Sequence, residues 1–128
     1  MCDPQLEIIM ATTTQDTLID AITTANAVNF KKLVLDSTGQ TVVEFMSYGC
    51  SYCREIEPLI QQVARAQEPY TKFVRVNVEM DAELEQDFRI SGTPTFVMFF
   101  NGVEVGRDEG PNPTLANLTA IVTEPFIQ

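Results

Sequence analysis

Hydrophobic and polar positions follow two patterns along this chain, one typical of strands and one typical of helices. Short apolar or alternating runs predict strands at residues 21–25, 41–46, 72–78, 95–100 and 103–107. The run at 41–46 is mostly apolar, which is expected of a central strand covered on both faces of a sheet. Asn101-Gly102, between the last two runs, is a strong signal for a two-residue hairpin turn.

The clearest helical pattern begins after residue 51. Its apolar residues recur at intervals of three and four and form one stripe, at Ile56, Leu59, Ile60, Val63 and Ala64. Pro58 lies within this stripe and is expected to bend the helix, because proline cannot donate the backbone hydrogen bond. Further helices are predicted in three places: after an Asn26 cap with Val28, Phe30, Leu33 and Val34; over the acidic residues 81–88; and at Leu115, Leu118, Ile121 and Val122.

The order of these elements is β-α-β-α-β-α-β-β-α, which predicts an α/β fold. The first half favours parallel strands with helices on both faces of the sheet, and the hairpin adds an antiparallel pair. With 128 residues the chain has the length of one domain. We predict a weakly ordered extension at residues 1–19 and a folded domain at residues 20–128.

Composition excludes several classes of function. The net charge of −10, from 18 acidic and 8 basic residues, disfavours nucleic acid and anionic membranes as partners. No apolar run approaches the roughly 20 residues that a membrane-spanning helix needs. The chain has no histidine, which removes Ser–His and Cys–His catalytic pairs and the commonest metal ligand. Catalysis must therefore depend on Cys, carboxylates, Lys, Tyr or Ser.

The cysteines are Cys2, Cys50 and Cys53, too few for a disulfide scaffold. Residues 1–10 include Asp3 and Glu7 and lack the basic and apolar regions of a signal peptide, so a cytoplasmic location is expected. The alternative is the bacterial periplasm, if a leader has been removed, and Cys2 would then suit a lipid anchor. A mobile, adventitious thiol is the simpler interpretation of Cys2.

Cys50 and Cys53 form a C-x-x-C motif between a predicted central strand and a predicted helix. The N-terminus of a helix stabilises a thiolate, so Cys50 is expected to have a lowered pKa and to act as the attacking thiol. Cys53 lies one turn further on, where it can form a disulfide with Cys50. A zinc or iron–sulfur site is the rival interpretation, but such a site normally takes four ligands and this chain has three cysteines. We expect neither a metal nor a cofactor.

Several spaced motifs resemble the thioredoxin family over roughly residues 20–124. They are V-V-E-F-M at 42–46, C-S-Y-C at 50–53, Pro58 within the following helix, and G-T-P-T at 92–95 followed by an apolar strand and N-G. The segment at 45–58 is also similar to the periplasmic disulfide oxidases, but the spacing between Cys53 and Thr93 leaves no room for their helical insertion. The resemblance implies the thioredoxin fold, a central mixed sheet with helices on both faces.

The resemblance also implies roles for individual residues. Pro94 would be a cis proline facing the disulfide, and the backbone of Thr93 would pair with an extended substrate segment. Glu44 takes the place of a buried acid that exchanges protons with the resolving cysteine, and Arg75 that of a nearby lysine. A carboxylate in an apolar strand is costly unless it is paired or protonated, so a purely structural pair with Arg75 is the alternative.

Two substitutions change the expected docking surface. Gly49 stands where the family has an aromatic residue before the first cysteine, and Tyr52 lies between the cysteines. Tyr52 is expected either to contact substrate through its ring or to be an exposed aromatic without a role. The simplest interpretation of Arg54, Glu55 and Glu57 is a solvated helix face.

The sequence therefore predicts a thiol–disulfide oxidoreductase that reduces protein disulfides. Its expected partners are a disulfide-containing protein substrate and a reductase or other thiol electron donor, and it is expected to be a monomer. Two alternatives stay open: a periplasmic disulfide oxidase or isomerase, and a thioredoxin-like binding module without turnover.

Overall fold

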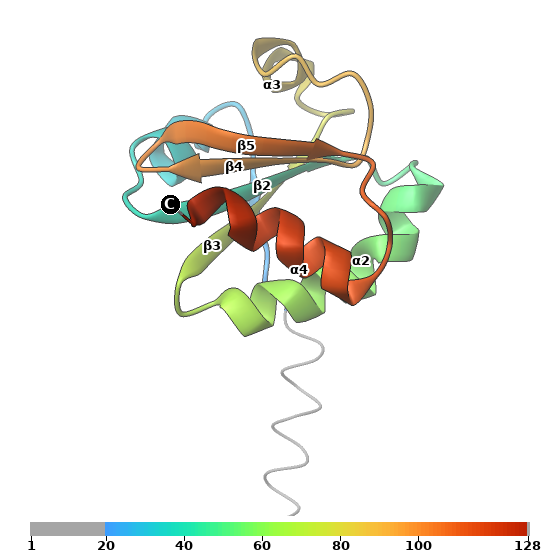
Figure 1. The fold of residues 1–128 in the computed structure, drawn as a ribbon. Coiled ribbons are helices and arrows are strands. Elements are labelled where there is room, and N and C mark those ends of the chain that lie inside the picture. Colours follow the sequence, from blue (N-terminus) through green and yellow to red (C-terminus); the bar gives the residue numbers. More distant parts are fainter. Residues whose placement is uncertain (1–19, 128) are drawn as a thin grey trace, which may run out of the picture.

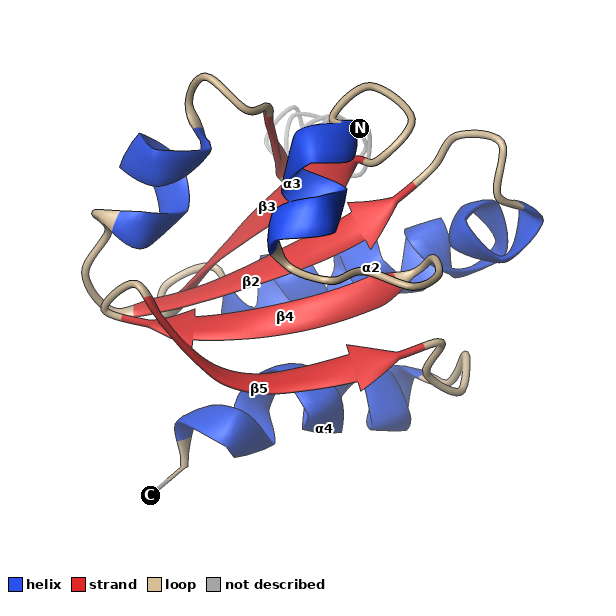
Figure 2. Ribbon diagram, turned by 90° about the horizontal axis from the view of Figure 1, so that it is seen from above, coloured by secondary structure: helices blue, strands red, loops and turns tan. Residues whose placement is uncertain are grey.

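A computed structural model of the chain describes residues 20–127, which form a five-stranded mixed sheet between helices (Figure 1). The strands are β1 (Thr23–Ala25), β2 (Gln40–Met46), β3 (Thr71–Asn77), β4 (Thr95–Phe100) and β5 (Val103–Glu109). Their order across the sheet is β1-β3-β2-β4-β5. The first three strands are parallel to one another, whereas β4 pairs antiparallel to β2 and β5 antiparallel to β4. The predicted mixed sheet is confirmed, and β2 lies at its centre (Figure 2).

Helices cover both faces of this sheet. They are η1 (Lys31–Leu35), α2 (Ser51–Gln67), α3 (Ala82–Asp87), α4 (Leu115–Thr123) and the short η2 (Glu124–Phe126). Helices α2 and α4 lie side by side on one face, and α3 lies on the opposite side of the sheet (Figure 1). Within residues 20–127, no helix has the length and apolarity that crossing a membrane requires.

Alternating side chains of the strands supply a separate apolar core for each face. Beneath α2 and α4 the core contains Val42, Ile56, Ile60, Val63, Phe96, Met98, Leu118 and Val122. On the other face it contains Phe30, Val34, Val43, Phe45, Val74, Val76, Leu84, Val97 and Phe99. Because β2 and β4 contribute to both cores, side chains on both of their faces are removed from water.

The segment after β1 differs from the predicted helix. The side chain of Asn26 accepts the backbone N–H groups of Val28 and Asn29 at 2.9 and 3.0 Å, so it holds the turn before the helix, whose own cap residue is Phe30. The chain then winds into the short, wide helix η1, which begins after the predicted helical residue Val28, and Val28 is 93 % exposed. Phe30 and Val34, four residues apart, are the side chains that reach the core.

Helix α2 carries the beginning of the candidate site. Its buried side chains follow the predicted stripe, with Cys53 added at the N-terminal end. Pro58 lies inside the helix, and Figure 1 shows α2 changing direction along its length. The bent helix starts next to the C-terminal end of β2, so the carboxyl end of the central strand leads directly to the two cysteines.

The β4–β5 hairpin depends on Gly102. Asn101 and Gly102 have φ values of 50° and 81°, as a two-residue hairpin of this type requires, and a Cβ on Gly102 would overlap the carbonyl oxygen of Leu35. We expect Gly102→Ala to lower the free energy of unfolding by roughly 2–3 kcal/mol, from backbone strain and the clash together. Urea unfolding measures this loss.

Gly39 provides the matched control for this substitution. Its φ is 80°, but a Cβ there would have nothing within 4 Å. Gly39→Ala is therefore expected to cost only about 1 kcal/mol, from backbone strain alone. Equal losses in the two variants would contradict a contribution from the contact with Leu35.

Candidate active site

Cys50 lies at the N-terminus of α2 as its cap residue, with extended backbone angles. Its sulfur accepts the backbone N–H of Cys53 at 3.1 Å, and its thiol donates to the carbonyl oxygen of Thr93 at 3.7 Å. Burial alone would raise the pKa of the Cys50 thiol, but hydrogen bonds with Cys53, together with one that involves the side chain of Thr93, bring the pKa below its ordinary value. Since the side chain is also partly exposed, Cys50 has the properties of a nucleophile.

Cys53 has the opposite character. It is 2 % exposed, and burial together with the hydrogen bond to Cys50 raises the pKa of its thiol to about 12. The two cysteines are free thiols, one helical turn apart. Cys53 therefore stays protonated until a base removes its proton, which suits a resolving thiol.

The loop before β4 faces the two cysteines. The Thr93–Pro94 peptide bond is cis, as the resemblance implies, and the carbonyl of Thr93 is directed at Cys50. Two hydrogen bonds hold this loop: Thr95 Oγ1 donates to the carbonyl of Gly92 at 2.7 Å, and the N–H of Gly110 donates to the carbonyl of Pro94 at 2.9 Å. The structure thus brings Cys50, Cys53, Thr93 and Pro94 together.

Glu44 is a buried acid on β2, directly opposite Arg75 on β3. Its Oε1 lies 4.0 Å from Arg75 Nε, which is too far for a hydrogen bond. Among the described residues neither carboxyl oxygen has a hydrogen-bond partner, and neither does Arg75 Nε. Burial, and secondarily the charge of Glu57, raise the pKa of Glu44 to about 8.

Arg75 gives its hydrogen bonds to two other acids. Nη1 donates to Asp20 Oδ2 at 2.9 Å, and Nη2 donates to Glu57 Oε1. The side-chain amide of Gln61 donates to both acids as well, to Asp20 at 2.7 Å and to Glu57 at 3.0 Å. The predicted proximity of Glu44 and Arg75 is therefore confirmed, but Arg75 is hydrogen-bonded elsewhere.

Sequence reasoning missed Asp20 and Glu57. Glu57 had been interpreted as part of a solvated helix face, yet it is only one-third exposed and is ion-paired with Arg75. A signal for it exists in the sequence, because Glu57 follows Cys53 by four residues and so lies on the same side of the helix. Asp20 precedes β1 and carries no such signal.

A small cavity of about 100 Å³ connects this charged group with the resolving thiol. Its lining consists of Met46, Tyr48, Cys53, Arg54, Glu57 and Arg75. Cys53 and the Arg75–Glu57 pair thus border the same space.

Gly49 and Tyr52 both have close neighbours, so they do not form the open docking surface that the sequence suggests. A Cβ on Gly49 would lie 2.9 Å from Glu79 Oε1, and that carboxylate also accepts the hydroxyl of Ser47. Tyr52 is half-buried against the core beneath α2 and α4, and its hydroxyl donates to the carbonyl of Pro111. Of the two interpretations of Tyr52, the exposed aromatic without a role is therefore wrong, and contact with substrate stays a prediction; Tyr48, 58 % exposed, is the exposed aromatic beside the site.

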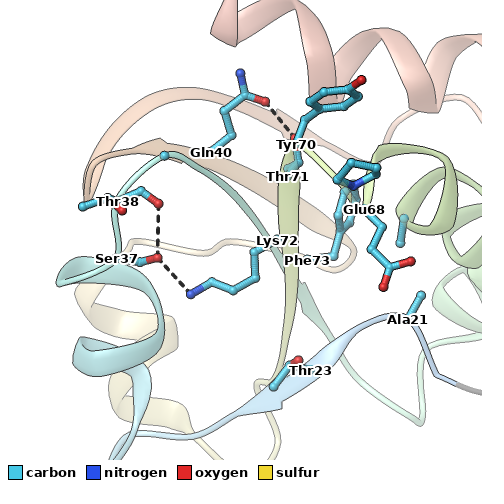
Figure 3. A pocket seen from close by; sticks show the side chains of 13 residues that line it. Ala21, Thr23, Ser37, Thr38, Gln40, Glu68, Tyr70, Thr71, Lys72 and Phe73 are labelled. Carbon is cyan, nitrogen blue, oxygen red and sulfur yellow. Dashed lines mark hydrogen bonds between the residues drawn. The ribbon is translucent and has the colours of Figure 1, made fainter.

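A hollow of about 440 Å³ lies away from Cys50 and Cys53, at the ends where β2 and β3 begin (Figure 3). Lys72 points toward it and donates to the carbonyl of Leu33 and to Ser37 Oγ. Neither Cys50 nor Cys53 lines it, so its walls offer no redox chemistry.

Among residues 20–127 no group of three metal-binding side chains is arranged around a metal site. Cys2 lies outside the described residues.

Comparisons with known proteins identify the family. The Thioredoxin family model matches residues 21–124. Thioredoxin 1 of Synechococcus elongatus is 31% identical over 90 residues, covering 69% of this chain and 84% of that protein. Thioredoxin M5, chloroplastic, of Oryza sativa subsp. japonica is 30% identical over 103 residues, covering 79% of this chain and 60% of that protein.

A longer relative matches as well. "Probable protein disulfide-isomerase A6" of Medicago sativa is 30% identical over 97 residues, covering 74% of this chain. The match spans only 27% of that protein. With a family model that covers most of the chain, a five-stranded mixed sheet and a C-x-x-C at the start of α2, this chain belongs to the thioredoxin family of thiol–disulfide oxidoreductases.

Proposed function

We propose that this protein reduces disulfide bonds in protein substrates by thiol–disulfide exchange. The Cys50 thiolate attacks one sulfur of the substrate disulfide, forming a Cys50–substrate disulfide and releasing the other substrate sulfur as a thiolate, which takes up a proton. Cys53 then loses its proton and attacks the Cys50 sulfur. The Cys50–Cys53 disulfide forms, the second substrate sulfur leaves, and the two electrons lost by the protein reside on the substrate thiols.

The observation that carries this proposal is the difference between two thiols one helical turn apart. Cys50 is partly exposed and its pKa is lowered, whereas Cys53 is buried and its pKa is raised to about 12. A nucleophile must be accessible and ionised, whereas a resolving thiol must be shielded until the mixed disulfide has formed. A binding module without turnover would have no use for this difference.

Glu44 is the proposed acceptor of the Cys53 proton. Its carboxyl has a pKa of about 8, so it can take up and return a proton close to neutral pH. The Cys50 thiolate contributes to raising that pKa, which places Glu44 within electrostatic reach of the two sulfurs. A purely structural pair is disfavoured, because Arg75 makes its hydrogen bonds with Asp20 and Glu57.

The surroundings of Cys50 favour reduction over oxidation. Hydrogen bonds, rather than a neighbouring cation, lower the pKa of the thiol. The adjacent cation, Arg54, donates instead to the carbonyl of Tyr48 at 2.7 Å. A strong oxidant needs an unusually stable reduced form, and nothing between the cysteines supplies the charge for it.

Substrate docking is proposed at the loop before β4. The backbone of Thr93 would pair with an extended substrate segment, with Pro94 holding that segment beside Cys50. The exposed ring of Tyr48 offers an apolar contact on the neighbouring surface. The hydroxyl of Tyr52 donates to the carbonyl of Pro111, and this hydrogen bond fixes the side chain that lies between the two cysteines in the sequence.

The family implies disulfide-containing substrates and a reductant that restores the dithiol. We further propose that the protein is a monomer and that it works in the cytoplasm. The scarcity of cysteine outside the C-x-x-C supports a reducing compartment. The periplasmic oxidase or isomerase is the second candidate, supported by the C-S-Y-C segment.

The equilibrium reduction potential of the Cys50–Cys53 pair tests the direction. We expect a value near −270 mV, about that of a reducing thioredoxin, in dithiothreitol redox buffers monitored by thiol alkylation. A value between about −180 and −120 mV would instead identify an oxidant or isomerase. If the pair forms no disulfide under any buffer, the enzymatic proposal fails and a binding role replaces it.

A further inference from the structure

Four polar side chains beside Cys53 form a closed ring of hydrogen bonds. Arg75 and Gln61 are the donors, and each donates to both acids, Asp20 and Glu57. Glu57 and Gln61 come from α2, Arg75 from β3, and Asp20 from the segment before β1. The ring therefore engages both Nη atoms of Arg75 with acids other than Glu44.

This arrangement leaves Glu44 facing a cation that does not bond to it. Only Arg75 Nε is directed at the Glu44 carboxyl, at 4.0 Å, and the facing atoms of both groups lack hydrogen-bond partners. Both side chains are buried: Glu44 is 2 % and Arg75 is 5 % exposed. A guanidinium that is free to turn could instead offer Glu44 a direct pair of hydrogen bonds.

The charges around Glu44 also disfavour the ionised form of its carboxyl. The groups that face it are Glu57 and Cys50 of α2, Arg75 of β3 and Asp20 before β1, while its neighbour on β4 is the apolar Phe96. The single positive charge of Arg75 is already exceeded by the two negative charges of Asp20 and Glu57. An ionised Glu44 would add a further negative charge to a buried site, which is strongly unfavourable.

We propose that Glu57 is a positioning residue that holds Arg75 away from Glu44 and thereby keeps the Glu44 carboxyl protonated near neutral pH. This inference rests on the proposed role of Glu44 as the acceptor of the Cys53 proton. Glu57 thus delays resolution of the mixed disulfide until the pH is high enough to ionise Glu44. After burial, the charge of Glu57 is the largest contribution that raises the pKa of Glu44.

The variant Glu57→Gln tests this inference, because it keeps the size of the side chain and removes its charge. In the oxidised protein, we expect the titration midpoint of the Glu44 carboxyl, followed by ¹³C NMR, to fall by about one pH unit. The rate of mixed-disulfide resolution at pH 7 should then rise about fivefold, since the ionised fraction of Glu44 grows from about a tenth to about a half. The initial attack by Cys50 should keep its rate.

Glu55→Gln is the matched control. Glu55 lies on the exposed face of the same helix, and its substitution removes the same charge two residues away. Neither the Glu44 midpoint nor the resolution rate should change in it. Asp20→Asn is a second test that does not depend on how well Glu57→Gln folds; it should shift the Glu44 midpoint the same way but less, since Asp20 is half-exposed.

These measurements separate the inference from the function on which it rests. If the Glu44 midpoint is the same in the wild type, Glu57→Gln and Asp20→Asn, Glu57 has no positioning role. The role of Glu44 stands in that case if resolution still follows its titration. If Glu44→Gln leaves the pH profile of resolution unchanged, the proposed proton acceptor itself is wrong.

Discussion

Replacing Cys53 with Ala should turn the protein into a trap that stays covalently attached to its substrate. Cys50 keeps its position at the N-terminus of α2 and its contact with the carbonyl of Thr93, so it can still attack a substrate disulfide. No thiol remains to break the resulting Cys50–substrate bond. We expect turnover to fall by at least about 10³-fold while a mixed disulfide accumulates at one per protein molecule.

The measurement is incubation with a disulfide-bonded protein such as insulin, followed by non-reducing electrophoresis and mass spectrometry. A Cys2→Ala background removes the third thiol. Cys50→Ala is the control; it should neither turn over nor form an adduct, because Cys53 is buried out of reach of a substrate disulfide and burial raises the pKa of its thiol. Adducts on Cys53 in that control would reverse the assignment of the two thiols.

Glu44→Gln should gain stability relative to the wild type as the pH rises from about 5 to about 8. The pKa of Glu44 is raised from 4.5 to about 8 in the folded protein. Between these two values the folded state holds a proton that the unfolded state has lost, so stability falls as pH rises through this window. Below 4.5 and above 8 the contribution of Glu44 is constant.

The expected difference between the variant and the wild type grows by roughly 3 kcal/mol from pH 5 to pH 8, because each unit of pKa shift corresponds to about 1.36 kcal/mol. Urea unfolding of the oxidised proteins measures it, since the cysteines do not titrate there. Comparing how the free energy of unfolding changes with pH in the two proteins cancels the cost of burying a Gln amide, because that cost does not depend on pH. A difference that does not change with pH would mean that Glu44 is not perturbed, and its proposed role as proton acceptor would lose its basis.

Local patterns predicted the elements of this fold well because hydrophobic periodicity is a local property. The strand at 95–100 matches β4, and the strand at 41–46 differs from β2 only at its first residue. The early helix was less predictable. The prediction places Val28 in the same helix as Phe30 and Val34, but the structure has Val28 exposed in the turn before η1, while Phe30 and Val34 pack inward.

The site was predicted only as far as its motifs extend. Cys50, Cys53 and Pro94 belong to short signatures, and Glu44 stands out as a charge in an apolar strand. The partners of Arg75 could not be predicted in this way, because Asp20 and Glu57 belong to separate segments that meet only in the folded chain. The same limitation applies to Tyr52, whose hydroxyl partner Pro111 lies 59 residues further along the chain.

The two outer borders of the sheet have a consequence for how extended peptides can bind. On one border β1 is only three residues long, and on the other β5 carries charged residues and is joined to β4 through an irregular register at Met98/Phe99. Short, charged or irregular borders discourage the addition of foreign strands. With the proposed pairing at the backbone of Thr93, whose carbonyl lies 3.7 Å from the sulfur of Cys50, an extended peptide bound there would be placed beside the attacking thiol.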